Sequence, residues 1–221
     1  MPTFISGLDL GQQQEFSALV TLEHHQIPDS ERKGVTLNRF DVRHIHRWEL
    51  RTSYPNIIED LKKWYTSTVL SNSKLIVDGT GVGQGVVDML RDADIPAGLE
   101  SFTITAGFRT GEGTVPKIDL VGVVQAALQT KRLLFAGELE LRPLLERELE
   151  TFRTKVTPDR NETFASWREK DHDDLVLALA LAVWWGEKNG GGFYTPHQGP
   201  LPRPDAPMPS WEQLRGNKPW G

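Results

Sequence analysis

The sequence predicts an α/β fold with a central mixed β-sheet, whose first three strands are antiparallel, flanked by helices. Two β-rich runs, residues 4–11 and 17–24, are separated by a short polar turn, and residues 36–50 alternate between apolar and charged side chains. A strand over residues 74–77 is followed by a glycine-rich turn and a helix to about residue 92, as in the layers of an α/β protein. With 221 residues, of which 38% are hydrophobic, the chain has the size of one such domain.

The remaining elements follow from apolar spacing. Helices are predicted over residues 55–69, from Pro116 to about residue 128, over 139–149 and over 175–185, and short strands over 102–106 and 133–135. Residues 151–166 are polar and receive no assignment. Residues 175–185 are apolar throughout, so this last helix is predicted to be buried on nearly all sides.

Two regions are predicted. Residues 1–188 form the folded domain, and residues 189–221 form a glycine- and proline-rich tail that we expect to be flexible. The sequence has no apolar run of bilayer length and no secretory signal, which predicts a protein of the cytoplasm.

Two aspartates occupy positions where a charge is costly. Asp9 lies between Leu8 and Leu10 in an apolar strand, and Asp78 ends the strand before a run of glycines. An ionised carboxylate in such a place needs a positive neighbour, and a bound metal ion would supply it. Each residue also fits the simpler role of an aspartate that caps a turn.

A third acidic site precedes the predicted buried helix. Asp173 and Asp174 would serve as an N-cap and as a favourable charge at the helix dipole, but burial of the helix would direct both carboxylates into the protein or a cleft. His172 beside them could orient a carboxylate, position a water molecule or assist a proton transfer, or it could simply be exposed to solvent.

Together these acids predict a metal site. Strand ends and a helix start can meet at one edge of an α/β sheet, and the chain has no cysteine, so its strong ligands are carboxylates and histidines. An all-oxygen site suits Mg²⁺ or Mn²⁺, and two such ions about 4 Å apart can catalyse phosphodiester cleavage.

The order of motifs resembles the nuclease domain of the large terminase subunit of tailed phages, which cuts viral DNA during packaging. The resemblance rests on residues 7–11 with 17–20, residues 76–83, Val115-Pro116-Lys117, residues 148–152, and residues 172–175 with Ala178. It implies a ribonuclease H-like fold, an Mg²⁺- or Mn²⁺-dependent endonuclease activity, and Asp9, Asp78 and one of Asp173 and Asp174 as ligands, with Asp174 favoured.

The resemblance also implies partners, and the chain departs from the family in two ways. The family's ATPase motor carries a phosphate-binding loop, but no G-x-x-x-x-G-K-[ST] motif occurs here, so we expect a separate ATPase motor, small terminase or portal subunit as a partner beside double-stranded DNA. The chain could equally be an excised domain or the product of a stand-alone gene. Many family members have a further acid where this chain has Leu177, which leaves the number of metal ions open.

DNA contacts are expected to be local, because the formal net charge is −5. Arg39, Arg43, Arg47 and Arg51 recur every four residues, which predicts one basic strand face, although a solvated outer face would look the same. Lys117 and Arg109 flank a glycine-rich loop that could reach a phosphate. The predicted DNA-binding residues are Lys117, Arg109, Arg43 and Arg47.

Three other functions remain open. A Holliday-junction resolvase on the same fold would share the metal site but bind DNA as a symmetric dimer. An inactive packaging or scaffold subunit would keep the fold without cutting. Sugar kinases and actin-like ATPases also begin with an Asp-x-Gly strand, but they need two domains and a longer chain, and they give the Asp173–Asp174 pair no role.

Overall fold

The computed structural model describes most of the chain. The described residues are 3–12, 14–67, 69–70, 72–82, 84–106, 111–155 and 173–190, with the backbone alone for residues 84 and 151–155. Residues 191–221 lie outside this range, so the division into a domain and a flexible tail stays a prediction. No helix in the described part of the chain is long and apolar enough to cross a membrane.

Within the described residues, seven strands form one mixed sheet in the order β6-β5-β4-β1-β2-β3-β7. Their bounds are β1 Thr3–Asp9, β2 Ala18–Pro28, β3 Thr36–Arg47, β4 Lys74–Asp78, β5 Gly98–Thr105, β6 Thr114–Pro116 and β7 Leu133–Phe135. The first three strands are antiparallel neighbours, whereas β4 is parallel to β1 and β5 is parallel to β4. The predicted mixed sheet with three antiparallel leading strands is therefore confirmed.

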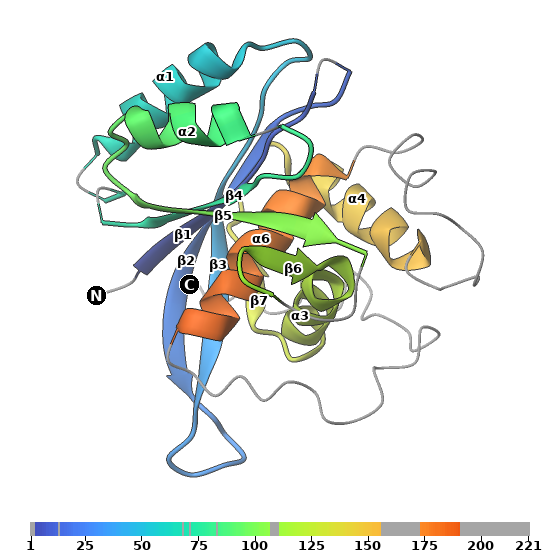
Figure 1. Cartoon of the computed structure of the whole chain (residues 1–221). Coiled ribbons are helices and arrows are strands. Elements are labelled where there is room, and N and C mark those ends of the chain that lie inside the picture. The colour runs from blue at the N-terminus through green and yellow to red at the C-terminus, as the bar shows by residue number, and fades with distance from the viewer. Residues whose placement is uncertain are drawn as a thin grey trace.

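Helices cover both faces of this sheet (Figure 1). They are α1 Tyr54–Tyr65, α2 Gln84–Asp92, α3 Lys117–Gln129, α4 Arg142–Lys155 and α6 Asp174–Asn189. One apolar cluster joins alternate residues of β1 and β4, such as Leu8 and Val77, to α1 and α2. The other cluster joins the opposite face, including Ile5 and Ile76, to α3, α4 and α6. We call the second face of the sheet the α6 face.

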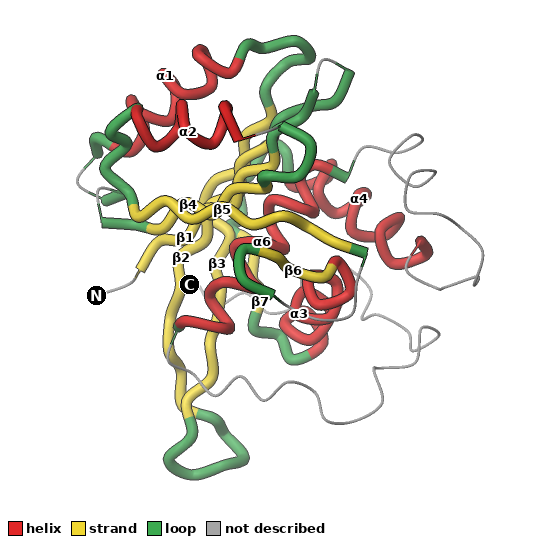
Figure 2. Tube along the Cα trace, viewed as in Figure 1, coloured by secondary structure: helices red, strands yellow, loops and turns green. Residues whose placement is uncertain are grey.

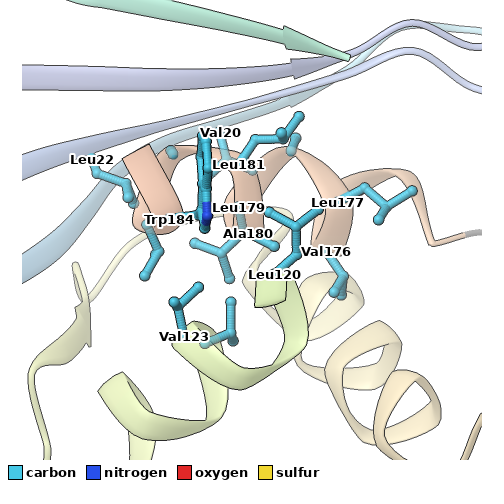
Figure 3. Packing of buried hydrophobic residues seen from close by; sticks show 14 of the residues in the cluster. Val20, Leu22, Leu120, Val123, Val176, Leu177, Leu179, Ala180, Leu181 and Trp184 are labelled. Carbon is cyan, nitrogen blue, oxygen red and sulfur yellow. The ribbon is translucent and has the colours of Figure 1, made fainter. Parts of the chain in front are cut away.

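Helix α6 is buried from Asp174 to Glu187, as its uninterrupted apolar sequence predicts. It lies between the sheet and α3, and its Leu181 and Ala180 point into the two surrounding layers (Figure 3). The close approach to β1 depends on a glycine: a Cβ atom placed on Gly7 would come 1.8 Å from the carbonyl oxygen of Ala178. A side chain at this position would therefore separate the helix from the strand.

A buried polar network holds the C-terminal half of α6. Glu187 accepts hydrogen bonds from Asn38 (3.0 Å) and Arg132 (2.5 Å), and Asn38 is bonded in turn to His24 at 2.9 Å. The Arg132 guanidinium also donates to the main-chain oxygen of Asn38. Because Glu187 is 5% exposed, this network supplies the partners that a buried carboxylate requires.

A β-bulge in β3 corrects the prediction of one basic strand face. The pairing of β2 with β3 shifts between Thr21 and Leu22, so Arg43 is an extra residue in β3. If even-numbered side chains face one side of the sheet before an extra residue, odd-numbered side chains face that side after it. Val42 and Arg47 consequently share the α6 face, while Arg43 lies with the charged residues of the other face.

Three boundaries also differ from the prediction. Strand β2 runs to Pro28, beyond the predicted end at His24, whereas β3 ends at Arg47, before the predicted end at Leu50. The two strands form a long hairpin that projects beyond the body of the sheet (Figure 2). Strand β5 begins at Gly98, four residues before the predicted start at Phe102. The segment Thr114–Pro116, predicted only as the approach to a helix, forms strand β6, and Pro116 then caps α3 with its extended backbone.

The contact between Gly7 and α6 gives a direct test of the packing. Replacing Gly7 with alanine should lower the free energy of unfolding by about 3 kcal/mol, the upper end of typical overpacking costs, because the new methyl group meets backbone atoms of α6. Gly122 in α3 is the matched control: its Cβ position is open, so Gly122→Ala should raise the free energy of unfolding by about 0.5–1 kcal/mol. Urea unfolding measures both, and equal stabilities for wild type and Gly7→Ala would contradict the close approach.

Candidate active site at the carboxyl ends of β1 and β4

Asp9 and Asp78 end neighbouring parallel strands. Leu8 pairs with Val77, so the two aspartates follow at the same level, on strands about 4.8 Å apart. Asp9 pairs with Ala18 of β2, whose side chain belongs to the α6 face, so the Asp9 side chain is on this face too. Asp78 directly follows Val77, whose side chain is on the opposite face, so Asp78 is also on the α6 face. Both carboxylates therefore start from the α6 face at one edge of the sheet.

The turn after β4 holds Asp78 in place. Its Oδ1 accepts a hydrogen bond of 2.7 Å from the main-chain nitrogen of Thr80, and only 1% of the residue is exposed. The Thr80 hydroxyl accepts from Ile104 of β5, and Gln12 donates to the main-chain oxygen of Gly81, which has a positive φ of 81°. The turn-capping role considered for Asp78 is thus present, and it fixes the direction of the carboxylate.

Helix α6 brings the third acidic site to the same edge. Along the helix, Gly186 is next to Ile5 and Ala178 is next to Gly7, so α6 runs antiparallel to β1. One turn before Ala178, the helix begins at Asp174, and two residues after Gly7 the strand ends at Asp9. Asp173 and Asp174 are therefore carried towards the ends of β1 and β4.

Glu148, not Asp173, caps α6 with its side chain. The Oε2 atom of Glu148 in α4 accepts from the main-chain nitrogens of Leu175 (3.0 Å) and Val176 (3.3 Å), whereas Asp173 makes no side-chain capping bond. This arrangement satisfies the free N–H groups at the helix start and leaves the Asp173 and Asp174 side chains to other partners. The sequence reasoning did not single out Glu148 as a site residue, although it lies in a segment that carried the family resemblance.

Two basic side chains neutralise this acidic group. Arg47 donates from Nη2 to Oδ1 of Asp174 (3.2 Å), while its Nε lies 3.0 Å from Oδ2 and its Nη1 lies 3.8 Å from Glu148. Lys117, the first residue of α3, donates to Asp173 at 3.3 Å. Each of these side chains is 12% exposed or less and directed at the acidic group, and its contact with DNA stays a prediction.

Burial perturbs two of the acids strongly. It raises the pKa of Asp174 to about 6, and the attraction of Arg47 limits the rise. Burial, followed by repulsion from Asp174, raises the pKa of Glu148 to about 8, again against the attraction of Arg47. Raised carboxyl pKa values show that negative charge is costly here, and a cation would remove that cost.

A pocket of about 430 Å³ opens beside the end of β1. It is lined by Gly11, Gln12, Glu15, Ser17, Glu49, Arg51, Thr52, Ser53 and Tyr54. Gly11 and Gln12 closely follow Asp9 along the chain, so the pocket lies beside the end of β1. The Tyr54 hydroxyl donates to the Gly11 carbonyl and ties the start of α1 to this loop.

The remaining predicted residues are not brought to this group. His172 and Arg109 lie outside the described residues. Arg43, on the opposite face, forms ion pairs with Glu23 (2.6 Å) and Asp41 (3.9 Å). Its predicted contact with DNA therefore could not be part of the same site.

Among the described residues, the group of three potential ligands whose atoms all lie within 4.8 Å of one another is on that opposite face. Glu23, His25 and Asp41 each offer an atom within 4.8 Å of the others, and His25 Nε2 is 3.3 Å from Asp41 and 3.5 Å from Glu23. Arg39 and Arg43 already pair with the two carboxylates, so the group is neutral overall. Glu23 pairs with Phe4 and Asp9 with Ala18, five residues apart along the hairpin, so this group cannot share an ion with Asp9.

Known structures resemble this arrangement, although no family model matches the chain and no curated protein matches its sequence significantly. The large terminase nuclease of thermophilic phage G20c aligns with a TM-score of 0.51 at 16% identity, over 82% of this chain and 81% of that one. Its magnesium-bound form gives 0.50 at 17% identity, over 82% and 80%. The chain has the ribonuclease H-like fold of phage terminase nuclease domains. RuvC of Thermus thermophilus covers 86% of this chain with a TM-score of only 0.39 at 11% identity.

The raised pKa values predict how stability depends on pH in this terminase-type fold. Because Asp174 and Glu148 bind protons more tightly when folded, their contribution to stability is full below their ordinary values of 3.8 and 4.5. It is lost as the pH rises through about 6 and then about 8. In EDTA, the melting temperature of wild type should therefore fall more between about pH 5 and about pH 8.5 than that of Glu148→Gln, which keeps a capping oxygen but cannot ionise.

The exposed residue Glu59 in α1 supplies the control. Glu59→Gln removes a carboxylate outside the acidic group, so its melting temperature should change with pH as that of wild type does. Parallel curves for wild type and Glu148→Gln would show that Glu148 does not titrate with a raised pKa.

Proposed function

We propose that the chain is a divalent-metal-dependent endodeoxyribonuclease of the phage terminase type, which cuts duplex DNA at the carboxyl ends of β1 and β4. The observation that carries this proposal is that three separate segments bearing acids end or begin at one edge of the sheet. Asp9 and Asp78 follow paired residues of adjacent strands, and α6 carries Asp174 to the same edge. The terminase-like fold supports it, because the G20c nuclease is known with bound magnesium.

The donor set fits Mg²⁺ or Mn²⁺. Asp9, Asp78, Asp174 and Asp173 offer oxygen ligands only, and the raised pKa of Asp174 indicates that its charge requires a cation. We infer that these four residues hold the ions, with Asp174 preferred to Asp173 as the direct ligand because Asp173 is engaged by Lys117. Two bound ions would activate the attacking water and stabilise the leaving oxygen of the phosphodiester.

The chain's own residues orient the site. The Thr80 main chain holds one oxygen of Asp78, and Glu148 fixes the start of α6 and thereby the position of Asp174. Lys117 and Arg47 supply positive charge beside the carboxylates, where a DNA phosphate would approach. The polar pocket beside Gly11 gives a DNA strand room at this edge.

DNA packaging would require an ATPase motor. Since residues 1–221 contain no phosphate-binding loop, we infer that a motor outside this sequence, together with a small terminase or portal subunit, moves the DNA. The acids of the site would then cut the DNA that the motor presents. In a phage or prophage setting, this would take place in the cytoplasm of the host cell.

Plasmid cleavage at low salt tests the nuclease proposal. The purified protein should nick supercoiled plasmid with Mg²⁺ or Mn²⁺ and not with EDTA, and Asp9→Ala and Asp78→Ala should each lower cutting to the background. Asp9→Ala should melt at or above the wild-type temperature, because loss of one carboxylate relieves repulsion between the acids, whereas Asp78→Ala also loses the hydrogen bond from Thr80 and should melt lower. Wild-type cutting by either variant would contradict the site.

Two controls complete this test. Asp92→Ala, at the exposed end of α2, should cut as wild type does. A four-way junction offered beside linear duplex distinguishes the resolvase alternative: preferred cutting of the junction by a dimeric protein would favour a Holliday-junction resolvase over a terminase-type nuclease.

A further inference from the structure

Arg47 occupies the oxygens that a metal ion would need. Its guanidinium faces both oxygens of Asp174, at 3.2 Å from Oδ1 and 3.0 Å from Oδ2. The Arg47 side chain is 12% exposed and that of Asp174 is 7% exposed, so this ion pair is largely withdrawn from solvent. Arg47 donates a hydrogen bond to Oδ1, whereas Oδ2 accepts none among the described residues, so a metal ion at Asp174 would compete with Arg47 for this carboxylate.

Arg47 also has an alternative partner, Glu148, within a short distance. Its guanidinium carbon lies 3.6 Å from the centre of the Phe16 ring, and Nη1 lies 3.8 Å from Oε1 of Glu148. That Oε1 atom is buried and makes no hydrogen bond among the described residues, while Oε2 of the same carboxylate caps α6. A small rotation would transfer Arg47 from Asp174 to Glu148 without disturbing the helix start, and the cation would stay over the aromatic ring.

We propose that Arg47 is an exchangeable counter-ion of the metal site. In the metal-free protein it neutralises Asp174, it competes with the metal ion for that carboxylate, and on metal binding it turns to Glu148 and contacts a phosphate oxygen of the bound DNA. This inference rests on the proposed nuclease function and adds to it a coupling between metal binding and DNA binding. It also gives Arg47 the DNA contact that the sequence predicted, but only in the metal-loaded state.

The bulge in β3 provides a matched control residue. Arg43 is on the same strand and also forms ion pairs with two acids, but those acids are Glu23 and Asp41 on the opposite face. Replacing either arginine with methionine keeps a long side chain and removes one positive charge. Only Arg47→Met should change the metal site.

Metal affinity is the first measurement. Free Mn²⁺ is followed by electron paramagnetic resonance for wild type and variant at several matched pH values up to about 8.5, because loss of Arg47 would also let protons compete more strongly for the acids. Arg47→Met should bind Mn²⁺ about fivefold more tightly than wild type or better, the lower end of typical coupling between sites. Arg43→Met should bind as wild type does, and the rise in melting temperature on adding Mn²⁺ should be largest for Arg47→Met.

DNA affinity is the second measurement and should change in the opposite direction. At saturating Mn²⁺, initial cutting rates over a range of duplex and salt concentrations give the apparent affinity. For Arg47→Met this affinity should be weaker, and the slope of its logarithm against the logarithm of salt should be smaller by about one phosphate contact. A residue with a purely structural role would weaken metal and DNA binding together.

The outcomes separate this inference from the nuclease proposal. Absence of Mn²⁺ binding by wild type, or wild-type binding by Asp78→Ala, would refute the proposed metal site itself. Binding by wild type together with equal or weaker binding by a folded Arg47→Met would overturn the counter-ion role alone. If Arg47→Met does not fold, Arg47→Lys keeps the charge but loses the planar fork, and its Mn²⁺ affinity should then exceed that of wild type.

Discussion

The backbone of α6 lies directly against β1 at Gly7, with no room for a side chain between them, and the remaining structure is arranged around this contact. The contact requires a helix that is apolar on all sides, since the sheet covers one face and α3 and α4 cover the others. It also fixes the level at which the helix begins. Asp174 is consequently placed beside the ends of β1 and β4, in an interior that accepts its charge only with a counter-ion.

The buried carboxylates at the two ends of α6 differ in how fully they are paired. At the C-terminal end, Glu187 is surrounded by Arg132, Asn38 and His24, a network with a partner for each carboxylate oxygen. At the N-terminal end, several acids share Arg47 and Lys117, and the pKa values of Asp174 and Glu148 remain raised. The first arrangement is that of a structural ion pair, and the second is typical of a site that awaits another charge.

The sequence was sufficient for the parts of the structure that local patterns determine. Alternating apolar residues located the leading strands, the unbroken apolar run located α6, and the isolated acids at strand ends indicated Asp9 and Asp78. Other features depend on distant segments that no local pattern reports. The capping of α6 by Glu148 joins residues 27 positions apart, and the Arg47–Asp174 pair joins residues 127 apart. The extra residue in β3 was also not predicted. A bulge shows only in how β3 pairs with β2, and the residue types of β3 remain those of an ordinary strand.

The extra residue in β3 changes which residues of this strand face α6. Up to Val42, even-numbered side chains belong to the α6 face, and from Ile45 onward odd-numbered ones do. Deletion of Arg43 would restore regular pairing of β2 with β3, because Val42 and His44 already pair with the adjacent residues Leu22 and Thr21. Every flanking side chain would keep its face, so Arg47 would still lie beside Asp174. In evolution, β3 can therefore lose one residue at the bulge without any change in the charges at this edge.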